Sequence, residues 1–460
     1  MSVETAGGTT LLTAPDHPSF AQMTAVFTRI GLMSFGGPAG QIALMHKVLV
    51  EEERWISETR FLHALNYCTL LPGPEAQQLA TYIGWLLHGT KGGVVAGTLF
   101  IIPGFFVILA LSVSYALFQQ TEILTSLFYG IKAAVLAVVI EAVLRVSRRA
   151  LRNGVMVALA ALAFIALFFF AVPFPLVVLT AGIVGYVGAR QRPDLFTASG
   201  HGGKAKADIG PAVIDGNMPE VDPSLGRAVR VVLVWGSLWV LPWIGLGLVF
   251  GWGSSFGGVY VFFSQMAVVT FGGAYAVLAY VAQEAVVTFG WLQPGEMIDG
   301  LALAETTPGP LVLVLTFVGF LAGYRDSLWL DPLLAGVLGA VLATWATFVP
   351  CFLWIFLGAP YIERLRNNKA VSGALAAITA AVVGVILNLA LWFGMHVVFN
   401  EVERVTWGPL NIALPVPPTI DWIALALCVL AGILVFRAKL GMLWTLALFG
   451  ILGLAVGLLP

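Results

Sequence analysis

The chain carries a series of apolar runs that are each long enough to cross a lipid bilayer as a helix. A transmembrane helix needs about 20 mostly apolar residues, because each residue adds about 1.5 Å across a hydrocarbon core about 30 Å thick. In lipid, backbone polar groups must be satisfied within the segment, which a helix achieves. The sequence therefore predicts an all-α polytopic membrane protein. The clear runs lie at 92–118, 123–146, 153–171, 173–190, 228–250, 332–358, 370–398, 420–437 and 440–459.

The composition agrees with this class and argues against several others. Hydrophobic residues make up 59% of the chain and charged residues 10%, whereas a soluble globular protein carries about 25% charged residues. A net charge of -1 offers no basic surface for nucleic acid. The cysteines lie far apart, so they indicate neither a disulfide framework nor a metal-binding pair. Residues 1–19 lack the basic and apolar regions of a signal peptide and are predicted to be a cytosolic tail.

Shorter or interrupted apolar stretches remain at 20–48, 58–88, 259–288 and 295–323. If each crosses once, the protein has about 13 spans; the sequence leaves open whether they cross or are re-entrant. The polar segment 191–227 is predicted to be a cytoplasmic linker loop. The ATP-binding motif GxxxxGK[ST] is absent from the sequence, so any pumping must be coupled to an ion gradient or to the membrane potential.

An internal repeat divides the chain into two halves. Phe35-Gly36-Gly37 recurs as Phe271-Gly272-Gly273, and Pro72-Gly73-Pro74 recurs as Pro308-Gly309-Pro310 at the same spacing. Trp55 and Trp291 keep that register between the two motifs. Such a match by chance is improbable, so the chain is duplicated. The first membrane repeat is predicted at 20–190 and the second at 259–460, joined by the linker loop and a linking helix at 228–250.

The charges of corresponding loops are reversed between the halves. Residues 145–152 are rich in Arg, whereas the matching loop at 399–419 carries Glu401 and Glu403 against one Arg. Conversely, the loop at 119–122 has no basic residue, and its counterpart at 363–369 carries Arg and Lys. Short basic loops stay in the cytoplasm. The pattern predicts two inverted-topology repeats with a cytoplasmic N-terminus, a common design among secondary transporters.

Glycine and proline predict breaks within the interrupted stretches. Paired glycines relax the helix, and proline lacks an N–H donor. A half-helix that starts after a break presents unpaired N–H groups and a partial positive charge, which together can bind an anion. A lone GG or PGP is more often a kink, but here both motifs occur in both halves. The predicted substrate-binding residues are Arg29, Ser34, Phe35, Gly36, Gly37, Pro38, Gln41, Pro72, Gly73, Pro74, Gln77, Lys132, Phe271, Gly272, Gly273, Thr307, Pro308, Gly309 and Pro310.

Charged residues inside apolar spans are costly and often functional. Arg29 and Lys132 could each pair with an oxyanion, although Lys132 could instead pair with Glu141 or snorkel to the interface. Glu75 and Glu305 adjoin the PGP motifs and are predicted to carry protons.

The alternative role of these carboxylates is an ion pair with Arg29, Lys47 or Arg60. The scattered histidines predict no metal site, and we find no catalytic constellation and no cofactor motif in the sequence, so an enzyme is not predicted.

The motif residues resemble the chromate ion transporter family, in its long two-domain form. The resemblance rests on 34–38 (SFGGP), Trp55 and 71–79 (LPGPEAQQL), and on 271–275 (FGGAY), Trp291 and 305–310 (ETTPGP). It implies a bacterial inner-membrane antiporter that exports chromate, with sulfate as a related substrate, confers chromate resistance and is energised by the proton motive force. The second half departs from the first, with Ala274 in place of Pro38 and Leu311 in place of Glu75.

The membrane potential favours export over uptake. A dianion that leaves a cell with a negative interior releases about 4–5 kcal/mol of free energy per 100 mV of membrane potential. An uncoupled anion channel and a sulfate transporter are the alternatives. A membrane enzyme acting on a lipid or polyprenyl substrate would need clustered acidic or histidine residues at one interface, which the sequence lacks. The expected partners are a chromate or sulfate ion and the lipid bilayer, and a homodimer is left open.

Overall fold

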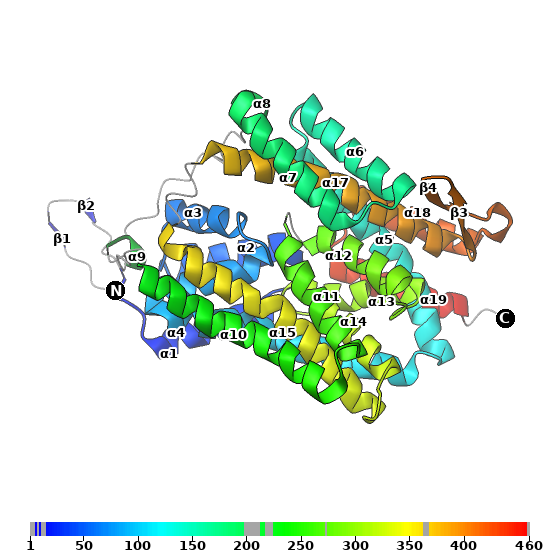
Figure 1. The fold of residues 1–460 in the computed structure, drawn as a ribbon, viewed down its shortest axis with the longest axis horizontal. Helices are drawn as coiled ribbons and strands as arrows, with labels where there is room; N and C mark the ends of the chain where they lie inside the picture. The colour runs from blue at the N-terminus through cyan, green and yellow to red at the C-terminus, as the bar shows by residue number, and fades with distance from the viewer. Residues whose placement is uncertain are drawn as a thin grey trace.

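The computed structural model describes residues 5–6, 9–10, 15–196, 212–216, 224–271, 274–361 and 368–457. The protein is almost entirely helical, which confirms the predicted all-α membrane class (Figure 1). Within the described ranges, six helices are long and apolar enough to cross a membrane, namely α4, α5, α7, α10, α15 and α17. Shorter apolar helices accompany them.

The first half contains helices that match the predicted runs closely. Its two short apolar stretches are broken, the first between α1 and α2 and the second between α3 and α4. A π-helical segment, η1, follows α2. The elements are α1 (Phe20–Met33), α2 (Gly37–His46), η1 (Lys47–Glu52), α3 (Glu58–Cys68), α4 (Glu75–Phe118), α5 (Glu122–Ala150), α6 (Gly154–Phe170) and α7 (Phe174–Gln191).

The second half repeats this order of elements. A π-helical segment, η2, again follows the second helix, at the position that corresponds to η1. The elements are α11 (Ser255–Val269), α12 (Ala274–Gln283), η2 (Glu284–Thr288), α13 (Pro294–Glu305), η3 (Leu311–Leu313), α14 (Val314–Arg325), α15 (Pro332–Gly358), η4 (Ala359–Tyr361), α17 (Lys369–Val398), β3 (Val402–Trp407), β4 (Leu410–Pro415), η5 (Pro417–Thr419), α18 (Trp422–Phe436) and α19 (Met442–Gly457).

Between the halves, α8 (Pro193–Phe196) and α9 (Val213–Gly216) are single turns in the predicted linker, most of which lies outside the described residues. The linking helix is α10 (Leu225–Phe250), which packs on α11 and α15. Its other side exposes Leu233, Leu241 and Leu248. Exposed leucines in such number are costly in water but suit contact with lipid. Near the N-terminus, the strands β1 (Thr5–Ala6) and β2 (Thr9–Thr10), of two residues each, pair in antiparallel orientation.

The runs 58–88 and 92–118 meet within α4 (Glu75–Phe118), whose backbone is non-helical at His88 and Gly89, where the predicted runs are separated. One local feature differs from the prediction. The predicted loop 399–419 contains the antiparallel hairpin β3–β4, in which Val402 lies opposite Pro415. All residues of β3 except Val402 are exposed.

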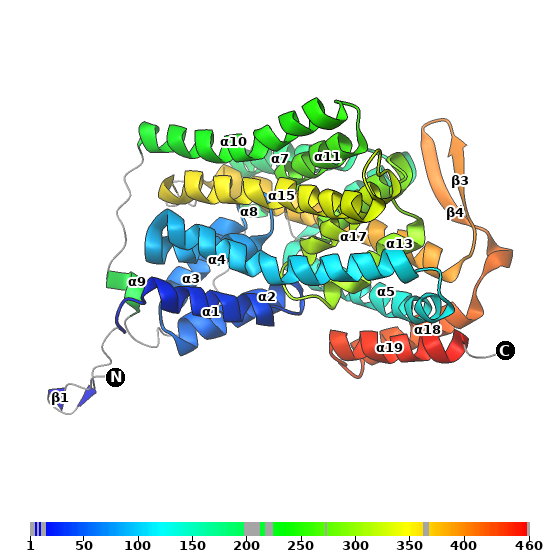
Figure 2. The same ribbon diagram turned by 90° about the horizontal axis from the view of Figure 1, so that it is seen from below.

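The halves interlock by exchanging a long helix. α5 of the first half packs against α18 and α19 of the second, and α17 of the second packs against α6 and α7 of the first (Figures 1 and 2). Gly130 on α5 lies against the backbone of Gly453 on α19, so a side chain there would overlap the facing helix. Small residues allow helices in membranes to approach closely. The two repeats therefore form one body.

Candidate functional site

The predicted breaks are present in the backbone. α1 ends at Met33 and α2 begins at Gly37, and Gly36 and Gly37 have φ values of 88° and 67°. Between α3 and α4, Gly73 has φ 123°, and its counterpart Gly309 has φ 95°. Only glycine adopts such angles readily. In the second half the chain breaks between α11 and α12, where Phe271 is described and the predicted site residues Gly272 and Gly273 lie outside the described residues.

Reciprocal hydrogen bonds bring the breaks of the two halves together. The N–H of Gly73 donates to the carbonyl oxygen of Thr270 at 2.9 Å, and the N–H of Gly309 donates to the carbonyl oxygen of Ser34 at 2.8 Å. Ser34 and Thr270 are corresponding residues of the repeats, as are Gly73 and Gly309. Each PGP segment is thus fastened to the break after the first helix of the other half. The four broken segments meet around an approximate two-fold axis.

Amide side chains brace this junction. Gln41 Nε2 donates to the carbonyl oxygen of Gly309 at 2.5 Å, and Gln78 Nε2 donates to that of Pro72 at 2.7 Å. Gln77 Nε2 donates to Thr81 Oγ1 at 3.0 Å. The Oε1 atoms of Gln77 and Gln78 are buried without a hydrogen-bond partner among the residues described. Gln41, predicted to bind substrate, therefore gives at least one of its donors to the protein backbone.

The half-helices at the junction start without side-chain caps. Neither Gly36 before α2, Pro74 before α4 nor Pro310 before η3 supplies a capping hydrogen bond. Many of the other helices are capped by a hydroxyl, amide or carboxylate side chain, as at Ser19, Thr121, Asn153, Ser254, Asp331, Asn368 and Asp421. Uncapped helix starts keep N–H groups available, and their partial positive charge attracts anions.

The two halves differ in how open their breaks are. Phe35 is 38% exposed and Gly36 is also exposed, while Pro38, Pro72 and Pro74 are half-buried. In contrast, Thr307, Pro308, Gly309 and Pro310 are all buried. The hydroxyl of Thr307 donates to the carbonyl oxygen of Leu303. The first-half break is therefore more exposed than the second PGP segment, which is packed inside the protein.

The predicted cationic residues both form ion pairs. Arg29 is half-exposed and pairs with Glu52 at 3.2 Å. Lys132 on α5 pairs with Asp299 on α13 at 3.4 Å, and thereby links the two halves. Glu141, the partner considered from the sequence, instead pairs with Arg145. The hydroxyl of Tyr115 donates to the other carboxylate oxygen of Asp299 at 2.9 Å.

Asp299 was missed by the sequence analysis, although an acidic residue within the apolar stretch 295–323 was a usable signal. It is 4% exposed.

The predicted proton carriers lie beside the PGP segments. Glu75 is the first residue of α4, and its carboxylate has no ion pair or hydrogen bond within the described part of the chain. Glu305 is 3% exposed and accepts a hydrogen bond from the hydroxyl of Tyr275 at 2.7 Å. The second oxygen of Glu305 is buried and lacks a described hydrogen-bond partner. Tyr275 therefore replaces the basic partner considered for Glu305, and Lys47 pairs with Glu52 instead.

Comparisons with known proteins agree with the duplication. The family model for the chromate transporter matches residues 21–186 and 258–454. The chain is 33% identical to the chromate transport protein of Pseudomonas aeruginosa over 81% of this chain and 80% of that protein. It is 27% identical to the chromate transport protein of Cupriavidus metallidurans, over 82% and 83% of the two chains.

A probable chromate transport protein of Synechococcus elongatus is 26% identical, over 82% of this chain and 86% of that protein. No solved structure matches the chain. The family model covers most of the chain, once in each half, and the helices are long and apolar enough to cross a membrane repeatedly. The chain therefore belongs to the chromate transporter family and is a multi-pass membrane protein.

Proposed function

We propose that this protein exports chromate across the bacterial inner membrane as a secondary active transporter. The observation that carries the proposal is the junction of broken helices, where α2 and α4 start uncapped and the breaks before them are hydrogen-bonded to segments of the second half. Unpaired N–H groups and helix dipoles bind oxyanions without needing a basic side chain. The relatives named as chromate transport proteins support chromate as the ion.

Membrane electrostatics supports outward transport. Moving a dianion out of a cell that is negative inside releases about 4–5 kcal/mol per 100 mV. Glu75 and Glu305 are the groups we propose to carry protons inwards in exchange, because both lie beside the junction and neither forms an ion pair in the described structure. The proton motive force would then drive an antiport.

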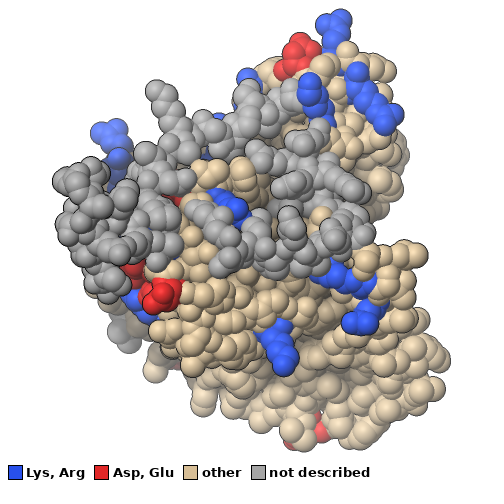
Figure 3. Space-filling view, turned by 90° about the vertical axis from the view of Figure 1, so that its left-hand side faces the viewer, with Lys and Arg blue, Asp and Glu red and all other residues tan. Residues whose placement is uncertain are grey.

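The distribution of charge supports a cytoplasmic N-terminus. Figure 3 views the end of the molecule at which α8, α9 and the start of α10 lie, and its charged side chains are mainly Lys and Arg. Arg148 and Arg149 end α5, and Arg190 lies in the last turn of α7. The β3–β4 hairpin, with Glu401 and Glu403, lies at the opposite end in Figures 1 and 2. Basic segments remain inside, so we propose that the repeats are inverted and that the hairpin faces outwards.

Transport into inverted vesicles tests this function. We expect the wild-type protein to accumulate labelled chromate when the vesicle interior is positive and acidic. Gly36→Ala should reduce the rate by about 5–30-fold, because an alanine at φ 88° costs about 1–2 kcal/mol in the backbone that shapes the site. Pro72→Ala should also slow transport. Gly251→Ala is the matched control, since Gly251 has the same φ and lies in a loop away from the junction.

The same assay separates the rival functions. A sulfate transporter would accumulate labelled sulfate and leave chromate outside, and an anion channel would equilibrate chromate without responding to an imposed proton gradient. Equal rates for Gly36→Ala and Gly251→Ala would contradict a site at the junction.

A further inference from the structure

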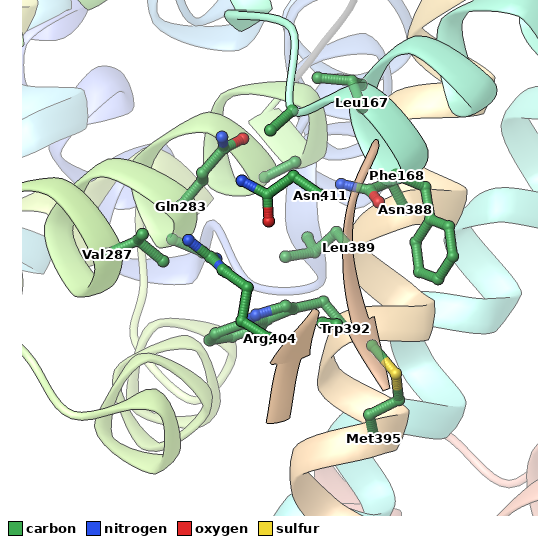
Figure 4. Close-up of a pocket in the computed structure, with 14 residues that line it drawn as sticks. Leu167, Phe168, Gln283, Val287, Asn388, Leu389, Trp392, Met395, Arg404 and Asn411 are labelled. Carbon is green, nitrogen blue, oxygen red and sulfur yellow. The ribbon is translucent and has the colours of Figure 1, made fainter. Parts of the chain in front are cut away.

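A polar pocket lies beneath the β3–β4 hairpin. Its walls come from α6, α12, η2, α17 and the hairpin itself, so both halves contribute (Figure 4). The hairpin lies at the end of the molecule opposite to the N-terminus (Figures 1 and 2). In the orientation proposed above, this end faces out of the cell. The pocket therefore lies where an exported ion would leave the protein.

One guanidinium group and three amides meet in this pocket. Figure 4 shows the side chains of Gln283, Asn411 and Asn388 around the pocket, with the guanidinium end of Arg404 on the side of the pocket where Gln283 and Val287 lie. In the described structure, none of these four side chains forms a hydrogen bond or an ion pair. Unused donors on separate elements that converge in one pocket indicate a ligand rather than a structural role.

The hairpin holds two of these side chains by its strand register. Arg404 pairs with Ala413, and Thr406 pairs with Asn411. Side chains alternate along a strand, so Arg404, Asn411 and Ala413 share the face that lines the pocket, while Glu403 points to the other face. Consequently the pocket lining carries a positive charge and no carboxylate.

This donor set suits a tetrahedral oxyanion. A guanidinium group binds two oxygens of one anion in parallel, and primary amides can donate to the others. The lining also includes the apolar side chains of Trp392, Leu389 and Phe168, while Arg404 itself is exposed. A metal cation is excluded by Arg404 and by the absence of acidic residues from the lining. A free oxyanion and the phosphate of a lipid headgroup share this chemistry.

The first half lacks an equivalent donor set. Asn388 and Trp392 on α17 correspond to Glu141 and Arg145 on α5, counted from the start of each helix. Glu141 and Arg145 pair with each other at 2.5 Å and so neutralise that surface. The corresponding connection between α5 and α6 is only 151–153, too short for a hairpin. The donor set is therefore specific to one end of the molecule.

We propose that Arg404, Gln283, Asn388 and Asn411 form an outer binding site for a tetrahedral oxyanion, through which the transported ion leaves. Naming the transported ion as the occupant rests on the proposed function. Binding to the protein in a phosphate-free detergent is the test, with chromate and sulfate as probes. Chromate quenches tryptophan, so Trp392 reports its arrival, and the Trp392→Phe variant defines the background.

We expect Arg404→Gln to weaken the Trp392-dependent binding at least tenfold, the loss typical of a charged hydrogen bond. Asn388→Ala should weaken it less and keeps the test valid if Arg404→Gln does not fold. Arg404→Lys should recover part of the affinity, since it keeps the charge and loses the parallel fork. The controls are Glu403→Gln, which changes charge on the opposite face of the same strand, and Arg437→Gln, which removes an exposed arginine elsewhere.

Each outcome bears on one claim. Unchanged binding in Arg404→Gln and Asn388→Ala, with normal chromate transport, would overturn the outer site and leave the proposed function standing. Arg404-dependent binding in a protein that does not move chromate would support the site and contradict the function. In phosphatidylglycerol nanodiscs, lipid retention that depends on Arg404 and that neither chromate nor sulfate displaces would identify a headgroup and overturn the exit role.

Discussion

At the scale of single residues, the buried charges are the least expected feature of so apolar a chain. Lys132 and Asp299 pair across the two halves, and Tyr115 donates a hydrogen bond to the other oxygen of the carboxylate. Among the described residues, Glu305 accepts a hydrogen bond only from the hydroxyl of Tyr275. A charge in an apolar span is expensive unless it is paired or functional. The Lys132–Asp299 pair is therefore tested through protein stability, and Glu305 is tested through the coupling of transport to protons.

We expect Lys132→Ala to destabilise the protein by about 3–5 kcal/mol, because it leaves Asp299 buried without its cation. The double variant Lys132→Ala/Asp299→Ala should recover much of that loss. Thermal unfolding in detergent measures both. Arg145→Ala is the control, since the Arg145–Glu141 pair is exposed and worth about 0–1 kcal/mol. Equal losses for Lys132→Ala and Arg145→Ala would show that the Lys132–Asp299 pair does not hold the halves together.

Glu305→Gln tests proton coupling, because glutamine keeps the shape and the hydrogen-bonding ability but cannot exchange a proton. In inverted vesicles, we expect its chromate uptake to respond to membrane potential and no longer to an imposed pH gradient. Glu75→Gln is tested in parallel, since the first half carries the carboxylate at a different place in its motif. Glu122→Gln, at an exposed helix start, should behave as wild type. A retained pH response in both site variants would exclude these carboxylates as the coupling groups.

At the scale of helices and strands, the exchanged pairs α5–α19 and α17–α7 depend on close backbone contact. Gly130→Ala would place a methyl group against the backbone of Phe449 and Gly453. Overpacking of this kind costs about 1–3 kcal/mol, so we expect a lower unfolding temperature in detergent. Gly236→Ala on α10 is the control, because no atom lies near its Cβ position and alanine favours a helix. Stability that fell equally in both variants would count against tight packing of the exchanged helices.

Much of this element pattern could be predicted from the sequence, because span length and helix breaks are local properties. The run 332–358 coincides with α15, and paired glycines interrupt the chain between Met33 and Gly37. Pairings between distant residues could not be predicted in this way. Nothing local shows that Gly73 bonds to Thr270, that Lys132 meets Asp299, or that Arg404 and Gln283 line the same pocket. The β3–β4 hairpin was not predicted, because the charged residues of the segment 399–419 were interpreted as a loop between two membrane spans.

At the scale of the whole molecule, the reciprocal bonds Gly73–Thr270 and Gly309–Ser34 tie the two repeats into a single symmetric frame. The residues placed on that frame are not symmetric. The first break is open and the second PGP segment is buried. Glu75 has no acidic counterpart, and the donor set of the outer pocket has no equivalent in the first half. Duplication thus supplies a pair of broken bundles, and we propose that the side chains that differ between them give transport its direction.

That direction depends on how the repeats cross the membrane, which accessible cysteines can establish. In a variant with Cys68, Cys351 and Cys428 replaced by alanine, single cysteines are placed at Gln120, Asn153, Glu401 and Arg437, each between helices. Inverted repeats with a cytoplasmic N-terminus require a membrane-impermeant maleimide to label positions 120 and 401 from outside cells, and 153 and 437 only after the membrane is opened.

Gln120 and Asn153 lie on consecutive loops of the first half, and Glu401 and Arg437 lie on consecutive loops of the second. The test therefore reads both halves independently. Position 120 follows the third long segment of its half and position 401 the fourth of its own, so parallel repeats would place them on opposite sides. Labelling of 120 and 437 together from outside would identify parallel repeats. It would also move the β3–β4 hairpin, and with it Arg404, to the cytoplasmic face, where the pocket would receive the anion before transport instead of releasing it.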